Sequence, residues 1–177
     1  SATIVDDVAL DPRTKTDNSR GRTTDGTATW SLFLTPTPGA SNAGASPEYA
    51  PRPALTPAAG FYAGTTNVTM SGGDATCTIH YTTDGSEPTL TSATYTAPVA
   101  VSATTVIRAA CFSSTAGVPS SFIETNTYFI NDNHTTAVLS IAGDQVMQLL
   151  NGSQIEPYGS LEYFGPDQAL SHEATGQ

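Results

Sequence analysis

Apolar and polar residues alternate through the middle of the chain with the two-residue period of a β-strand. Val68 and Met70 alternate with threonines, for example, and Val99 and Val101 share one face of a short run. Turn-forming residues, of which Asp84-Gly85 is the clearest pair, separate the alternating segments. Short strands at this spacing predict an all-β, antiparallel β-sandwich. The predicted strands are 65–70, 77–83, 98–102, 104–112 and 122–130.

The pattern weakens on both sides of this region and divides the chain into four parts. A strand is expected at 29–34, ended by prolines, and residues 43–53 form a Pro- and Ala-rich linker. Further along, strands are expected at 137–142 and 160–164, and Asp144 is expected to cap a helix over 145–150. The polar end from 165 to 177 is expected to fray. The predicted parts are 1–42, 43–53, 54–130 and 131–177.

Charge narrows the classes of partner. The net charge is -10, and the chain has six lysines and arginines in total. Nucleic acid and anionic membrane surfaces are disfavoured as partners, because no basic cluster is present to meet their phosphates. No apolar run reaches the roughly 20 residues that span a bilayer. The chain begins in what reads as a domain, so we expect a processed or excised fragment with any targeting signal upstream.

Three runs of residues carry a family resemblance. They are Gly60-Phe61-Tyr62, the TTDGSEPT run at 82–89 and the TTVIRA run at 104–109. With them, residues 54–130 resemble the chitobiase/β-hexosaminidase C-terminal-type domain, an immunoglobulin- or Fn3-like sandwich. The resemblance implies an accessory module of secreted bacterial enzymes and surface proteins, with no catalytic residues to carry over. We therefore expect no enzymatic activity and an extracellular or cell-surface location.

The flanking parts resemble two other families. Trp30 and the runs at 19–22 and 35–42 resemble the end of a bacterial lamin-tail-type domain. Residues 137–141 and 159–167 resemble the opening of a CotH-like kinase region. In that family the phosphate- and metal-holding residues lie further along than this chain extends, so kinase activity is not carried over.

Cys77 and Cys111 are the only cysteines in the sequence. In an immunoglobulin-like topology their strands are antiparallel neighbours, and such pairing brings the two residues to one end. A disulfide is expected, with two buried free thiols as the alternative.

Candidate chemistry elsewhere is sparse. The Asp84–Pro88 run is interpreted as a tight turn rather than a ligand site. No cofactor is expected; Ca²⁺ is a weak possibility at Asp6, Asp7 and Asp11, which we interpret as solvated acids. The histidines, His80, His134 and His172, are far apart in the sequence and lack metal-ligand spacing.

Aromatic side chains offer a last possibility, because sugar rings stack on exposed aromatics. The candidates are Trp30, Tyr49, Tyr62, Tyr95 and Tyr158. Three functions stay open. The first is a non-catalytic structural spacer or assembly unit of a secreted bacterial surface protein, with other domains or copies as partners. The second is a carbohydrate-binding accessory module that contacts polysaccharide. The third is a filament or layer subunit completed by strand exchange.

Overall fold

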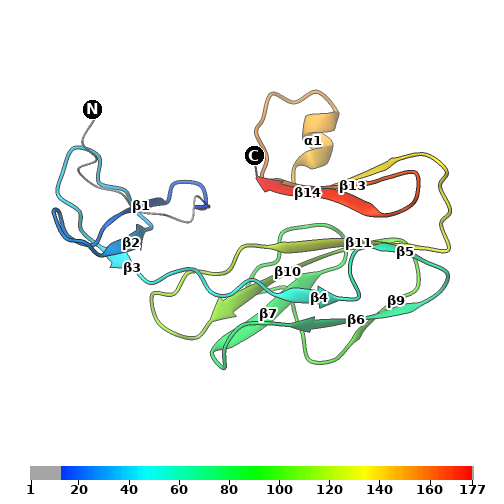
Figure 1. Cartoon of the computed structure of the whole chain (residues 1–177), viewed down its shortest axis with the longest axis horizontal. Coiled ribbons are helices and arrows are strands. Elements are labelled where there is room, and N and C mark those ends of the chain that lie inside the picture. The colour runs from blue at the N-terminus through cyan, green and yellow to red at the C-terminus, as the bar shows by residue number, and fades with distance from the viewer. Residues whose placement is uncertain (1–12, 177) are drawn as a thin grey trace, which may run out of the picture. The chain divides into compact units, whose positions relative to one another are not determined.

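The computed structural model describes residues 13–176 and is all-β apart from one short helix in that range (Figure 1). Contacts divide the chain into two compact units, Ser1–Glu48 and Tyr49–Gln177. The elements in chain order are β1 (Ser19–Arg22), β2 (Trp30–Phe33), β3 (Ala45–Ser46), β4 (Ala54–Thr56), β5 (Gly60–Tyr62), β6 (Thr66–Ser71), β7 (Cys77–Thr82), β8 (Ala93–Thr94), β9 (Val99–Val101), β10 (Thr105–Ser113), β11 (Glu124–Ile130), β12 (Val138–Ala142), α1 (Val146–Leu150), β13 (Gly159–Phe164) and β14 (Leu170–Gly176).

The first unit holds a three-stranded antiparallel sheet in the order β1-β2-β3. Leu32 and Phe33 of β2 are its buried apolar residues. Trp30 opens the strand expected at this position, and the guanidinium of Arg22 lies 5.3 Å from the centre of its ring. The prediction of a strand over 29–34 is confirmed.

The second unit contains the predicted sandwich. One sheet has the order β5-β11-β10-β7-β8, and the other has the order β4-β6-β9. The alternating residues of the predicted strands meet between them, because inward side chains of both sheets fill one core. The buried core residues are Leu55, Val68, Met70, Ile79, Val101, Ile107, Ala109, Tyr128 and Ile130.

A third sheet, β12-β13-β14, belongs to the same unit, and we call it the C-terminal sheet. It packs on the outer face of the five-stranded sheet, beside β11 (Figure 1). The rings of Phe129 on β11 and Phe164 on β13 meet edge to face, 5.2 Å apart. As a result, β10 is buried from Ile107 to Cys111 and β11 is buried from Thr125 to Ile130.

The end of the chain differs from its prediction. Residues 165–177 were expected to fray, but β14 pairs antiparallel with β13 through Glu162↔Glu173 and neighbouring positions. The polar side chains of this stretch do not prevent pairing, because strands pair through backbone hydrogen bonds. The Thr175 hydroxyl of β14 also has a polar partner in Ser160.

The capping role expected for Asp144 is wrong. Helix α1 begins at Val146 with Gln145 at its N-cap position, and no side chain caps it. The Asp144 carboxylate instead accepts a hydrogen bond from the backbone N–H of Glu87, 2.5 Å away in the sandwich. A long-range backbone donor therefore takes the acceptor that local capping would have used.

Candidate functional site

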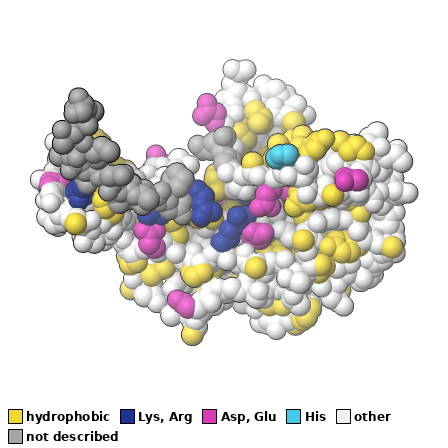
Figure 2. Space-filling model, in the orientation of Figure 1, with side chains coloured by type: hydrophobic (Ala, Val, Ile, Leu, Met, Phe, Trp, Pro, Cys, Tyr) yellow, Lys and Arg dark blue, Asp and Glu magenta, His cyan; other side chains and the backbone are white. Residues whose placement is uncertain are grey.

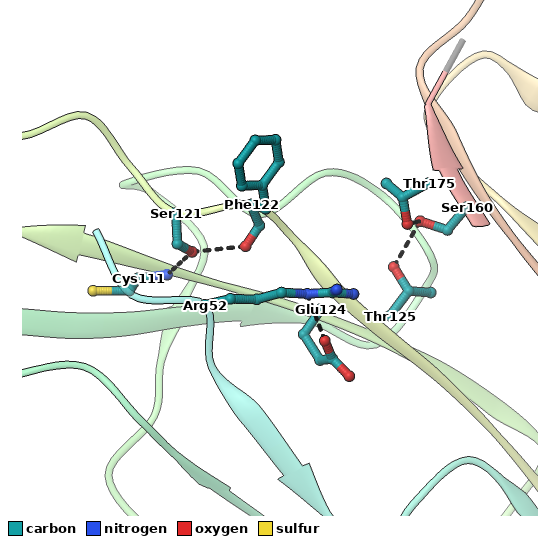
Figure 3. A network of polar contacts seen from close by, with 8 residues as sticks. All are labelled: Arg52, Cys111, Ser121, Phe122, Glu124, Thr125, Ser160 and Thr175. Atoms are coloured by element: carbon teal, nitrogen blue, oxygen red, sulfur yellow. Dashed lines mark hydrogen bonds and ion pairs between the residues drawn. The ribbon is translucent and has the colours of Figure 1, made fainter. Parts of the chain in front are cut away.

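The most distinctive site is the polar junction between the sandwich and the C-terminal sheet. Residues with odd numbers on β11 and even numbers on β13 point into it, since side chains alternate along a strand. The hydroxyls of Thr125 and Ser160 lie 2.9 Å apart, and Ser160 also lies 3.3 Å from the Thr175 hydroxyl (Figure 3). The hydroxyls of Thr127 and Ser140 lie 2.6 Å apart. The three strands of the C-terminal sheet all contribute to this layer.

Glu162 lies at the centre of the junction and is 2% exposed. Its Oε1 accepts the backbone N–H of Thr127 at 3.2 Å, and its Oε2 lies 2.5 Å from the Thr127 hydroxyl. Burial raises the pKa of Glu162 to about 7, the Thr127 hydrogen bonds oppose this, and the nearby carboxylates of Glu173 and Glu124 add to it. The carboxyl group is therefore held largely neutral in mild acid.

Glu124 lies on β11 at the margin of this network and pairs with Arg52. Arg52 Nε is 2.6 Å from Glu124 Oε2 (Figure 3). Partial burial raises the pKa of Glu124, Arg52 lowers it, and Glu173 raises it again. The pair joins the segment before β4 to the five-stranded sheet.

Arg108 occupies the junction on β10 and has no exposed surface. Its Nη1 donates to the Gly85 carbonyl at 3.3 Å, while Nε and Nη2 have no hydrogen-bond partner among residues 13–176. Burial lowers the pKa of Arg108, and the charges of Glu87 and Asp144 oppose that shift. Arg108 thus supplies positive charge where the loop containing Glu87 meets the loop containing Asp144.

The turn at Asp84 places the Gly85 carbonyl and Glu87 beside Arg108. Gly85 has φ 79°, a left-handed conformation that favours glycine. Asp84 Oδ1 accepts the backbone N–H of Ser86 at 3.0 Å and its hydroxyl at 2.6 Å, and both bonds lower the pKa of Asp84. The interpretation of this run as a turn is confirmed.

Cys77 and Cys111 form a disulfide with a Cα–Cα distance of 5.5 Å. They lie on the antiparallel neighbours β7 and β10, as the topology predicts. Next to the bridge, the Ser121 hydroxyl accepts the Cys111 backbone N–H at 2.8 Å and donates to the Phe122 carbonyl at 2.7 Å (Figure 3). The disulfide and this bond tie the end of β10 to both of its flanks.

The aromatic residues considered for glycan stacking are half-buried. Tyr49 packs on Phe122 with ring centres 4.9 Å apart, and the Tyr62 hydroxyl donates to the Ala58 carbonyl at 2.5 Å. Tyr95 packs against the sandwich core. The candidates are Trp30 in the first unit and Tyr49, Tyr62, Tyr95 and Tyr158 in the second.

The three histidines considered for metal binding do not form a metal-ligand set. His80 is buried and its Nδ1 lies 2.9 Å from the Ser92 carbonyl, whereas His134 and His172 lie near other aromatic rings. Over the described range, no group of three or more His, Cys, Asp or Glu could hold a metal ion. Asp6, Asp7 and Asp11 lie outside the described residues.

Sequence reasoning missed Glu162, Arg108 and Thr127, the residues that organise the junction. Arg108 carried the one available signal, since an arginine inside the run Val106-Ile107-Arg108-Ala109-Ala110 interrupts an otherwise apolar strand.

A helix long and apolar enough to cross a membrane is absent from residues 13–176.

Fold and disulfide together define the second unit as an immunoglobulin-like β-sandwich module with an added sheet. Residues 57–124 match the family described as the chitobiase/beta-hexosaminidase C-terminal domain, whose members are non-catalytic β-sandwich modules. No curated protein and no solved structure matches the chain. The family match covers neither flank, so the lamin-tail and CotH-like resemblances stay predictions.

Proposed function

We propose that this chain acts as a non-catalytic spacer of an extracellular protein, a rigid module that holds its neighbours at a fixed distance. The main support for this proposal is the junction. There, buried polar contacts fasten the C-terminal sheet to the sandwich, in addition to the segment that connects them. Thr125–Ser160 and Thr127–Glu162 are two buried fastening points, and the exposed contact between Glu87 and Asp144 is a third.

The chemistry of these contacts suits a spacer. Buried hydrogen bonds specify one arrangement of two sheets, because any other arrangement leaves their donors and acceptors without partners. The disulfide stiffens the sandwich and suits an oxidising exterior, which supports the extracellular location. The non-catalytic character of the matched family agrees with this role.

The test is the relative motion of the two parts. Residual dipolar couplings from the sandwich and the C-terminal sheet should fit one alignment tensor. Their backbone ¹⁵N relaxation rates should likewise fit one rotational diffusion tensor. The variant Thr125→Val/Thr127→Val should give two tensors, while Thr91→Val on an exposed loop should leave one. Independent tumbling of the two sheets in the unaltered chain would refute a rigid spacer.

A second candidate is an assembly unit that binds copies of itself or other domains. The outer face of the C-terminal sheet and α1 exposes large apolar side chains, and hydrophobic atoms are visible over this part of the molecule (Figure 2). Leu139 and Tyr163 are cross-strand neighbours on that face. The exposed apolar residues are Leu139, Ile141, Met147, Leu149, Leu150 and Tyr163.

Contiguous apolar surface of this kind is typical of interaction sites. Sedimentation velocity over a wide concentration range should show association, and Leu139→Lys/Ile141→Lys should abolish it. A monomer at every concentration would count against assembly through this face. For strand exchange, the described β12, β13 and β14 already pair within one chain, so exchange would have to displace existing hydrogen bonds.

A further inference from the structure

A groove of about 400 Å³ lies where β5, the segment after β11 and the turn between β13 and β14 meet. Its lining combines two aromatic residues with three side-chain amides and one carboxylate. The residues that matter are Phe61, Tyr62, Asn131, Asp132, Asn133 and Gln168. The junction fastens the C-terminal sheet in place, and so it also builds this groove from segments far apart in the sequence.

The groove walls are held by hydrogen bonds. The Asn131 backbone N–H donates to the Tyr62 carbonyl at 2.8 Å. Gln168 Nε2 donates to Asn133 Oδ1 at 2.7 Å and to the His134 carbonyl at 3.2 Å. The Thr104 hydroxyl donates to Asp132 Oδ2. These bonds fix the lining before any ligand binds, which lowers the entropic cost of binding.

Backbone conformation singles out the same place. Asn131 has φ 57° and Gln168 has φ 64°, both in the left-handed region that side chains other than glycine rarely adopt. Across residues 13–176, one other non-glycine residue, Asp17, shares this conformation. Strained residues of this kind gather at binding sites, where the surrounding fold holds them.

Several hydrogen-bond donors and acceptors in the groove remain available to a ligand after its internal hydrogen bonds are made. The Asn131 side-chain amide, Asn133 Nδ2 and Gln168 Oε1 make no hydrogen bond to another residue of the described chain. Planar amides place a donor and an acceptor side by side, and a carboxylate adds two acceptors. Adjacent hydroxyls on a sugar ring offer the complementary donor and acceptor pair.

We propose that this groove binds a neutral saccharide of one or two rings, a role that goes beyond the spacer function. Its volume lies in the range of small-ligand sites. Lys, Arg and His are absent from its described lining, and Asp132 would repel an acidic sugar. A peptide is the weaker fit, because recognition at a sheet edge uses a row of backbone groups and β5 has three residues.

The test is an NMR titration of the intact chain with cellobiose, xylobiose, mannobiose and lactose, with di-galacturonic acid as the acidic comparator. At least one neutral probe should shift the side-chain amide signals of Asn131, Asn133 and Gln168. Asn131→Gly is the decisive variant, because it removes an amide that makes no internal bond and glycine accepts φ 57° without strain.

Asn131→Gly should weaken binding about tenfold, the loss expected for one hydrogen bond. Gln168→Gly should weaken it at least as much, and Gln148→Ala on α1 should leave the affinity unchanged. Failure of all four neutral probes, shifts confined to other residues, equal binding of the acidic comparator, or unchanged affinity in Asn131→Gly would each overturn the proposal. Binding of an unstructured peptide library at these amides in place of sugars would also overturn it.

Discussion

Thr127 on β11 and Glu162 on β13 meet across the junction, with the Thr127 hydroxyl 2.5 Å from Glu162 Oε2 and its backbone N–H 3.2 Å from Glu162 Oε1. The Thr127 hydroxyl also lies 2.6 Å from the Ser140 hydroxyl. It can donate to an ionised Glu162, or accept from a protonated Glu162 and donate to Ser140 instead. The Thr127–Glu162 hydrogen bond can therefore form in either protonation state, but ionisation of Glu162 places a charge in a buried site, which costs free energy.

The free energy of unfolding of the second unit should fall as the pH rises from about 4.5 to about 7. In this window the folded chain retains a proton on Glu162 that the unfolded chain releases, because the folded-state pKa is raised from 4.5 to about 7. The full decrease is on the order of 3 kcal/mol. Urea titrations at intervals of half a pH unit measure it.

Glu162→Gln is the matched control for this pH dependence. Glutamine keeps an acceptor for the Thr127 N–H and a donor for its hydroxyl, but it does not ionise. Its stability should fall much less steeply from pH 5 to pH 7, and the slope that remains belongs to Glu124, whose pKa burial also raises. A slope as steep as that of the unaltered chain would assign the pH dependence to another group. The hydrogen bonds of the Asp84 turn should be lost only at more acidic pH, because they lower the pKa of Asp84.

Removal of the disulfide should destabilise the sandwich without changing its fold. Cys77→Ala/Cys111→Ala opens a loop closed over 34 residues, and the chain-entropy relation predicts a loss of about 3 to 4 kcal/mol. Urea unfolding with and without a reducing agent gives the comparison. The reduced unaltered chain should resemble the double variant, and a reductant should leave the double variant unaffected.

Arg108 should be more easily replaced by methionine than by alanine. Among residues 13–176, two of its three guanidinium nitrogens have no hydrogen-bond partner, so the charge contributes little, whereas its aliphatic stem fills space in the junction. Arg108→Met should change the free energy of unfolding by less than about 1 kcal/mol. Arg108→Ala should cost about 3 kcal/mol through the cavity it leaves. Equal losses in the two variants would show instead that the charge interaction with Glu87 and Asp144 dominates.

Asp144→Ala should loosen the loop contact and leave helix α1 intact. Its carboxylate accepts the Glu87 N–H and does not cap α1. Hydrogen exchange at the Glu87 amide should accelerate at least tenfold, while helical signals of Val146–Leu150 stay unchanged. Asp144→Asn retains the acceptor oxygen and should restore most of the protection. Melting of α1 in the alanine variant would reinstate the capping role.

The sandwich was predictable because its causes are local. Val68 and Met70 alternate with threonines, Asp84-Gly85 specifies a turn, and Cys77 and Cys111 stand at matching ends of neighbouring strands. The junction was not predictable, because Glu162 and Thr127 are 35 positions apart and neither belongs to a sequence pattern. The polar stretch that forms β14 looked frayed for the same reason, since its partner strand is set by the fold.

Patterns along the chain were sufficient to predict the all-β class, the strands of the sandwich and the Asp84 turn, and they favoured a disulfide between the two cysteines over free thiols. Alternation and turn chemistry act over a few residues, so they can be read along the chain. Tertiary structure alone decided that the C-terminal sheet covers β10 and β11, that Arg108 and Glu162 are buried, and that Asp144 binds Glu87. Burial and long-range hydrogen bonds depend on which surfaces meet, and no local pattern specifies that.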